Sequence, residues 1–160
     1  MSHAEALKRF YEGEVLGETI YSALYEAAND PLERRKWATL LQLETETKAW
    51  LRPHLVAHGV GVEEHGVDRQ RVLDLVVPAL GQTWLEQMQV LADGIETQAI
   101  PPYQAFAEEA KSRGDSDQES VCRYMVDHEK AQVEFARREL AGDPDALASV
   151  TRFLKYPIGT

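Results

Sequence analysis

Four long segments of this chain repeat apolar residues every three or four positions, which is the spacing of an amphipathic α-helix. We expect these helices over residues 3–28, 31–57, 82–112 and 117–140. Clusters of turn-forming residues separate the segments, and no alternating pattern typical of a β-strand lies between them. The sequence therefore predicts an all-α fold.

The connection between the second and third long segments is the longest in the chain. Residues 59–68 predict a loop, residues 69–77 a short helix, and residues 145–155 a short terminal helix. Pro101 and Pro102 interrupt the third long segment and predict a kink there. One long crossover is typical of a known class of antiparallel four-helix bundles. We therefore expect one domain over the whole chain, with a crossover between long helices 2 and 3.

Composition excludes several classes of function. The formal net charge of −10 argues against nucleic acids and anionic membranes as partners, because both require basic patches. The sequence has no run of 18 apolar residues, and its first residues lack the apolar stretch of a signal peptide. Cys122 is the only cysteine, so no intramolecular disulfide can form. We expect a cytoplasmic protein in which Cys122 is a core residue rather than a nucleophile.

Each long segment carries a glutamate within its apolar stripe. At about 100° per residue, these four side chains fall on the face that must become core. They are Glu14, Glu44, Glu96 and Glu129. Glu18 lies one turn after Glu14 and is an alternative inward carboxylate for the first helix. Any one of them could be an edge residue, but four converging carboxylates would require protons, lysines or metal ions.

Lys48 is the nearest candidate counter-charge. It lies one turn after Glu44, at the edge of the same stripe. Its ammonium group could neutralise the carboxylates in place of one metal charge. The alternative is that Lys48 lies at the rim of the bundle with its head group in solvent.

A short motif in the first helix resembles a known family. Gly13-Glu14-Val15, followed by Ile20-Tyr21, is similar to the first-helix motif of carboxylate-bridged di-iron proteins of the ferritin-like superfamily. The resemblance is closest to the demethoxyubiquinone hydroxylase, aldehyde-deformylating oxygenase and rubrerythrin-like branches. In that motif a tyrosine follows the glutamate by seven residues.

The same glutamate-to-tyrosine spacing recurs at Glu96 and Tyr103. The resemblance implies a ferritin-like bundle, with Tyr21 and Tyr103 beside the metal site. It also implies that the four inward glutamates are the metal-binding glutamates, and that the protein is a homodimer.

Two positions depart from the family pattern. Its second and fourth helices carry Glu-x-x-His, whereas this chain has Thr47 and Gln132 at the histidine positions. Thr47 and Gln132 are polar, but neither is a usual strong ligand for iron. The remaining histidines lie too far away, point elsewhere or fall in flanking segments, and we expect them to be packing or surface residues. They are His3, His54, His58, His65 and His128.

Two functions therefore remain open. The loss of both histidines slightly favours a ferritin-like protein that has lost its di-iron site and acts as a binding or structural protein. The four glutamates favour the alternative, an oxidase- or oxygenase-like protein that binds iron or manganese through oxygen ligands. A small apolar ligand would also suit the apolar stripes.

Overall fold

Every regular element that the structure describes is a helix. The computed structural model describes residues 2–64 and 68–158, and these ranges contain no β-strand. The expectation of an all-α chain is thus confirmed. No helix in these ranges combines the length and the apolar character that a bilayer span requires.

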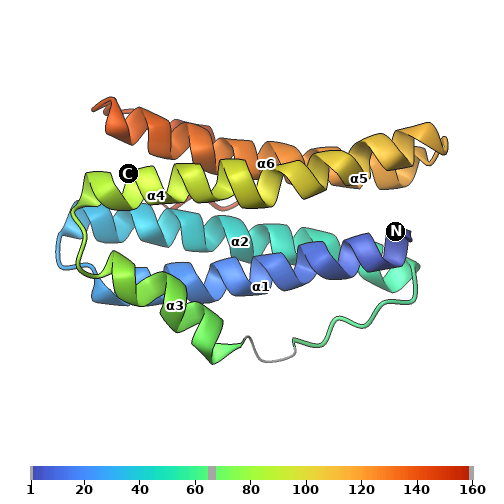
Figure 1. The fold of residues 1–160 in the computed structure, drawn as a ribbon, viewed down its shortest axis with the longest axis horizontal. Helices are drawn as coiled ribbons and strands as arrows, with labels where there is room; N and C mark the ends of the chain where they lie inside the picture. Colours follow the sequence, from blue (N-terminus) through green and yellow to red (C-terminus); the bar gives the residue numbers. More distant parts are fainter. Residues whose placement is uncertain (1, 65–67, 159–160) are drawn as a thin grey trace. The chain divides into compact units, whose positions relative to one another are not determined.

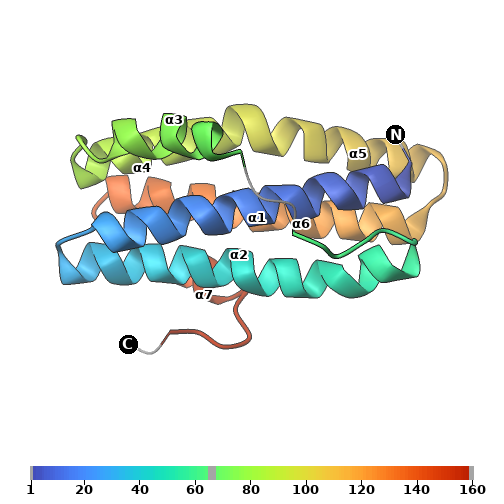
Figure 2. The same ribbon diagram turned by 90° about the horizontal axis from the view of Figure 1, so that it is seen from below.

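The first two long helices form a hairpin. Helix α1 covers His3–Ala27 and helix α2 covers Pro31–Ala57, in close agreement with the predicted ranges. A turn of three residues joins them, so the helices run antiparallel, side by side, in both views (Figures 1 and 2). The turn ends at Asp30, whose side chain accepts hydrogen bonds from the backbone N–H groups of Leu32 and Glu33. Asp30 is therefore the N-cap that fixes where α2 begins.

The chain divides into two compact units, which we describe separately. One contains residues 2–83 and the C-terminal tail from residue 153, and the other contains residues 84–152. The core of the first unit comes mainly from the facing sides of α1 and α2. Its buried apolar side chains include Leu7, Phe10, Tyr21, Trp37, Leu40, Leu43 and Leu51.

Helix α3 covers Arg69–Ala79 and packs against α1 in the first unit. The sequence predicts that this helix ends at Pro78, but Pro78 lies within its last turn. The loop between α2 and α3 begins at Gly59, which has a φ of 70°. Few residues other than glycine adopt this backbone angle at low cost. The Val60 N–H then bonds back to the Leu55 carbonyl at 2.9 Å, which closes the end of α2.

The C-terminal tail is attached to α2 through its backbone. The carboxylate of Glu46 accepts hydrogen bonds from the N–H groups of Lys155, at 2.5 Å, and Tyr156, at 3.0 Å. Gln42 donates a third hydrogen bond to the same carboxylate. Burial alone would raise the pKa of Glu46, but these donors outweigh it and lower the pKa.

The second unit pairs an interrupted helix with a continuous one. Helix α4 (Trp84–Gly94), the π-helical segment η1 (Ile95–Ala99) and helix α5 (Ile100–Ser112) pack along helix α6 (Ser116–Leu140). A single turn, α7 (Ala148–Thr151), packs on α6 in place of the longer terminal helix expected over 145–155.

The interruption of the third long segment differs from the predicted kink. The sequence predicts one helix over 82–112 that bends at Pro101 and Pro102, but the irregularity lies just before them, in η1. Proline has no N–H to donate, and a π turn re-pairs the backbone with i→i+5 bonds around such a position. The N-cap of α6 is Asp115, whereas the sequence suggests Asp117.

The Asp30 cap gives a first testable expectation. Replacing Asp30 with alanine removes the acceptor for two backbone N–H groups and should lower the free energy of unfolding by about 1 kcal/mol. Chemical denaturation followed by circular dichroism measures the change. Glu26→Ala, an exposed position on α1, is the control and should stay within about 0.5 kcal/mol of wild type. Equal effects of the two substitutions would show that Asp30 does not act as a cap.

Candidate functional site

Two buried glutamates face each other within the α1–α2 hairpin. Glu14 on α1 is 1% exposed and Glu44 on α2 is 3% exposed. A carboxylate oxygen of Glu14 lies within 4.8 Å of one of Glu44. The structure thus decides between the two first-helix candidates, because Glu14 is the buried carboxylate and Glu18 is only half-buried.

Gly17 provides the space for the Glu44 carboxylate. A Cβ atom built on Gly17 would lie 2.4 Å from Oε2 of Glu44, which is far inside van der Waals contact. Glycine within a helix costs about 1 kcal/mol relative to alanine. The absence of a side chain at Gly17 leaves a notch in α1, one turn after Glu14, that accommodates the Glu44 side chain from α2.

The electrostatic cost of this pair is considerable. Two charges about 4.8 Å apart repel each other by roughly 3–4 kcal/mol at an effective dielectric constant of about 20. Removing each charge from water adds a further cost of several kcal/mol. Ionised Glu14 and Glu44 therefore require a compensating positive charge close to both.

Lys48 does not supply that charge to this pair. Its ammonium group contacts the carboxylates of Glu18, at 2.5 Å, and Glu64, at 2.8 Å. Burial would lower the pKa of Lys48, but the hydrogen bonds to these two carboxylates raise it overall. Thr45 also donates a hydrogen bond to Glu18, at 2.6 Å. Lys48 is therefore the centre of a separate ion-pair network on the same helix pair.

Tyr11 and Arg52 complete this network. The hydroxyl of Tyr11 donates to Glu64 at 3.3 Å and accepts a hydrogen bond from Nε of Arg52 at 3.2 Å. Arg52 also contacts Glu64 directly, at 3.1 Å. The hydrogen bond from Lys48 is the largest influence on Glu64, and it lowers the pKa of that carboxyl.

Glu64 and Arg52 do not emerge from the sequence as site residues. Glu64 lies in a loop, where no periodicity indicates which way a side chain points. Arg52 lies on the polar side of α2, where an arginine is ordinary. Only the meeting of the loop with Tyr11 brings these side chains to Lys48, and no local pattern predicts that meeting.

Glu96 is a correction to the predicted set. The sequence places it on an inward face, but its carboxylate is 43% exposed and accepts a hydrogen bond from Arg137 at 2.7 Å. The prediction assumes a constant 100° per residue, whereas Glu96 lies in η1, where the π turn takes extra residues and shifts the register. The expectation of an inward carboxylate at this position is wrong.

Helix α6 buries three polar residues in sequence proximity. Glu129, Gln132 and His128 are all buried, with His128 fully so. The Nε2 atoms of Gln132 and His128 lie 2.9 Å apart, a hydrogen-bonding distance. Gln132 thus already has a partner on its own helix.

The remaining predicted residues are placed as follows. Thr47 is buried on α2, and Tyr21 is buried and stacks on Trp37 with ring centroids 5.7 Å apart. Tyr103 on α5 is half-buried. Cys122 is buried, and burial raises the pKa of its thiol to about 11, so it is a core residue and carries little thiolate at neutral pH.

Comparison with known proteins provides no further constraint. No family model matches the chain. No curated protein and no solved structure matches it either.

The notch at Gly17 leads to a test of how closely α1 and α2 fit. Gly17→Ala should fail to give the gain of up to about 1 kcal/mol that alanine normally provides in a helix, because its Cβ displaces the Glu44 carboxylate. In a Glu44→Ala background the same substitution should recover that gain. Thermal and urea unfolding of the four proteins give the coupling energy.

Gly94→Ala is the matched control, since nothing lies within 4 Å of a Cβ built at that helical position. It should stabilise the protein in both backgrounds. If Gly17→Ala is as favourable in the wild type as it is without Glu44, the notch has no role in holding the carboxylate.

The Lys48 network should be visible in the pH dependence of stability. Lys48→Met should lower the free energy of unfolding by about 1–2 kcal/mol at pH 7, between the values typical of exposed and of buried ion pairs. The folded pKa of Glu64 lies below its ordinary 4.5, so its contribution is present above that pH and is lost as the pH falls through the folded value. Urea unfolding between pH 3 and 7 should therefore show a shallower acid-side loss in Lys48→Met. Parallel curves would contradict the network.

Proposed function

We propose that this protein binds a divalent cation through the carboxylates of Glu14 and Glu44. The observation that carries the proposal is the approach of two buried carboxylates, which each offer an oxygen within 4.8 Å of the other. The nearest lysine pairs with Glu18 and Glu64, so its charge serves a different set of carboxylates. A divalent cation placed between the two side chains would bind an oxygen of each and offset the cost of burying both charges.

The residues present fit such an ion. The notch at Gly17 accommodates an oxygen of Glu44, which any larger residue at position 17 would displace. A carboxylate oxygen of Glu14 lies within 4.8 Å of one of Glu44. Carboxylate oxygens suit manganese or magnesium better than a histidine-supported iron. When bound, such an ion would supply positive charge and Lewis acidity. Glu14 and Glu44 would hold it, and Thr47, buried on the same helix as Glu44, would add a polar oxygen to the lining.

The proposal is narrower than the four-glutamate di-iron site that the sequence suggests. Glu96 is exposed and engaged by Arg137, which leaves it unsuited to an inward site. We therefore favour one ion rather than two. The ferritin-like bundle, the crossover through α3 and the homodimer belong to the same proposal. They are supported by the order of the helices and by the motif around Glu14.

The second candidate is a metal-free binding or structural protein. It is favoured by Gln132, whose side-chain nitrogen lies at hydrogen-bonding distance from His128, and by the engagement of Glu96 with Arg137. Under this alternative, protons take the place of the ion at Glu14 and Glu44, and added metal leaves the stability unchanged.

Metal titration separates the two candidates. Chelator-treated protein should bind Mn²⁺ with a stoichiometry near one, measured by electron paramagnetic resonance, and should gain thermal stability as Mn²⁺ rises. Glu44→Gln should abolish both effects, because it removes one ligand charge while preserving the shape of the side chain. Glu26→Gln, on the exposed side of α1, should leave both unchanged.

The metal-free alternative gives a different pattern. Neither Mn²⁺, Mg²⁺ nor Fe²⁺ would then raise the melting temperature, and Glu44→Gln, which resembles the protonated carboxyl group, would leave it close to that of wild type. Binding that Glu44→Gln and Glu26→Gln weaken equally would show that Mn²⁺ associates with the acidic surface and not with the buried pair.

A further inference from the structure

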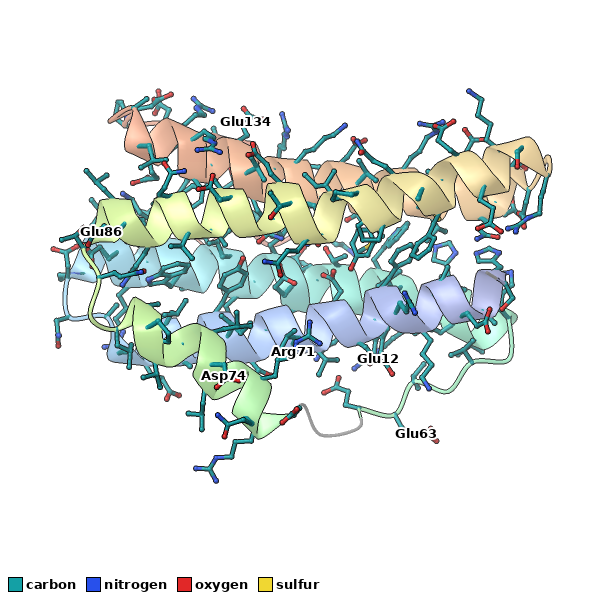
Figure 3. All side chains as sticks on the ribbon, in the orientation of Figure 1. Glu12, Glu63, Arg71, Asp74, Glu86 and Glu134 are labelled. Atoms are coloured by element: carbon teal, nitrogen blue, oxygen red, sulfur yellow. The ribbon has the colours of Figure 1, made fainter. Side chains whose placement is uncertain are left out.

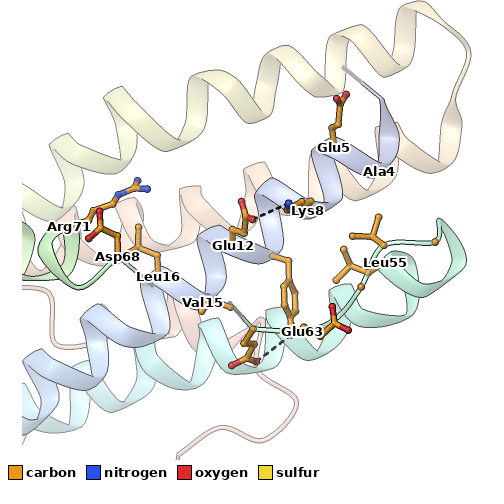
Figure 4. Close-up of a pocket in the computed structure, with 15 residues that line it drawn as sticks. Ala4, Glu5, Lys8, Glu12, Val15, Leu16, Leu55, Glu63, Asp68 and Arg71 are labelled. Atoms are coloured by element: carbon orange, nitrogen blue, oxygen red, sulfur yellow. Dashed lines mark hydrogen bonds and ion pairs between the residues drawn. The ribbon is translucent and has the colours of Figure 1, made fainter. Parts of the chain in front are cut away.

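A pocket of about 560 Å³ lies beside α1, away from the two buried carboxylates of the proposed cation site. Its size falls within the range of small-molecule sites. Its described lining residues belong to the first unit and come from α1, the end of α2, the loop that follows α2 and the residues at the start of α3 (Figure 4). Partly exposed apolar side chains form part of its surface, namely Val15, Leu16 and Val60.

Specific contacts hold the loop wall in place. The hydroxyl of Tyr11, a lining residue, contacts the carbonyl of Val62 and the carboxylate of Glu64, each at 3.3 Å. Glu64 is also held by Lys48 and Arg52. At the other end of the loop, the bond from Val60 to Leu55 fixes the first residues after α2. The pocket is therefore bounded by a loop that is anchored at two points.

The lining is acidic overall. It contains five carboxylates and two cations, a formal charge of −3, and the charged residues are Glu5, Glu12, Glu63, Glu64, Asp68, Lys8 and Arg71. Most of these carboxylates already have a partner. Glu5 caps α1, Glu12 pairs with Lys8 at 3.8 Å, Glu64 belongs to the Lys48 network and Asp68 caps α3.

Glu63 is the exception among these carboxylates. No cation of residues 2–64 or 68–158 forms an ion pair with it. Glu63 lies on the loop that follows α2 and its side chain is exposed, whereas Arg71 lies beside Asp68 at the α3 end (Figures 3 and 4). The pocket thus combines one available negative charge with an apolar wall next to it.

We propose that this pocket binds a small organic cation, with its ammonium group at Glu63 and its apolar body against Val15 and Val60. The apolar wall accounts for the body of the ligand, since each buried methylene contributes about 0.8 kcal/mol. The charge of the lining determines the sign of the head group. A carboxylate-bearing analogue would meet Glu63 and a net negative field.

Three probes with the same body test this assignment. They are 4-phenylbutylammonium, 4-phenylbutanol and 4-phenylbutanoate, titrated into the full chain in the presence of chelator and followed by two-dimensional NMR. Because chelator is present throughout, the outcome does not depend on the proposed cation site. The ammonium compound should bind about tenfold more tightly than the carboxylate, with the alcohol between them, since one partly exposed charge pair is gained and one repulsion is avoided. Shifted resonances should include those of Val15 and Val60.

Two variants make the test specific. Glu63→Gln should reduce the preference for the ammonium compound to about twofold while leaving the alcohol unaffected, and Glu26→Gln on the exposed side of α1 should change neither. Val15→Phe, which fills the apolar wall, should weaken all three probes. The proposal is overturned if the ammonium compound does not bind, if 4-phenylbutanoate binds equally well, or if Glu63→Gln and Glu26→Gln act alike.

Discussion

Repulsion between two buried carboxylates is the constraint on which the first unit depends. Carboxylate oxygens of Glu14 and Glu44 lie within 4.8 Å of each other on adjacent helices, and both side chains are buried. The hairpin accepts a glycine in mid-helix to bring them together, at Gly17. Gly17 lowers the stability of the hairpin through its poor helix propensity, and the two carboxylates lower it through their repulsion. Packing alone does not explain the presence of these residues. We infer that the reason for their presence is the binding of a positive charge.

The Lys48 network shows how the same helices treat other carboxylates. Glu18 and Glu64 are partly exposed and share one ammonium group, which is the ordinary way to place acids near an apolar surface. The two arrangements lie on neighbouring turns but use different chemistry. Lys48 pairs with Glu18 and Glu64, whereas Glu14 and Glu44 bring two buried carboxylates to within 4.8 Å of each other. This contrast distinguishes a structural ion-pair network from a candidate ligand site.

The sequence predicts the elements well because their signals are local. Apolar spacing and turn residues locate α1, α2 and α6 closely, and the same spacing identifies Glu14, Glu44 and Glu129 as buried. The prediction that Glu96 points inward is wrong because it assumes a constant 100° per residue. A π turn changes the number of residues per turn without any change in the apolar pattern of the sequence. Glu64 and the pocket beside α1 escape prediction for a different reason. Both depend on where a loop returns to a helix, and hydrophobic periodicity contains no information about loops.

The attachment of the C-terminal tail has a consequence for how freely that tail can vary. Glu46 holds it through the main-chain N–H groups of Lys155 and Tyr156, which every residue except proline possesses. These hydrogen bonds therefore do not depend on which side chains the tail carries, but they do depend on how many residues precede Lys155. Substitutions along the tail should have little effect on its attachment to α2. An insertion or deletion between α7 and Lys155 would instead bring different backbone N–H groups to the Glu46 carboxylate. The contact therefore depends on the number of residues between α7 and Lys155 and not on which residues they are.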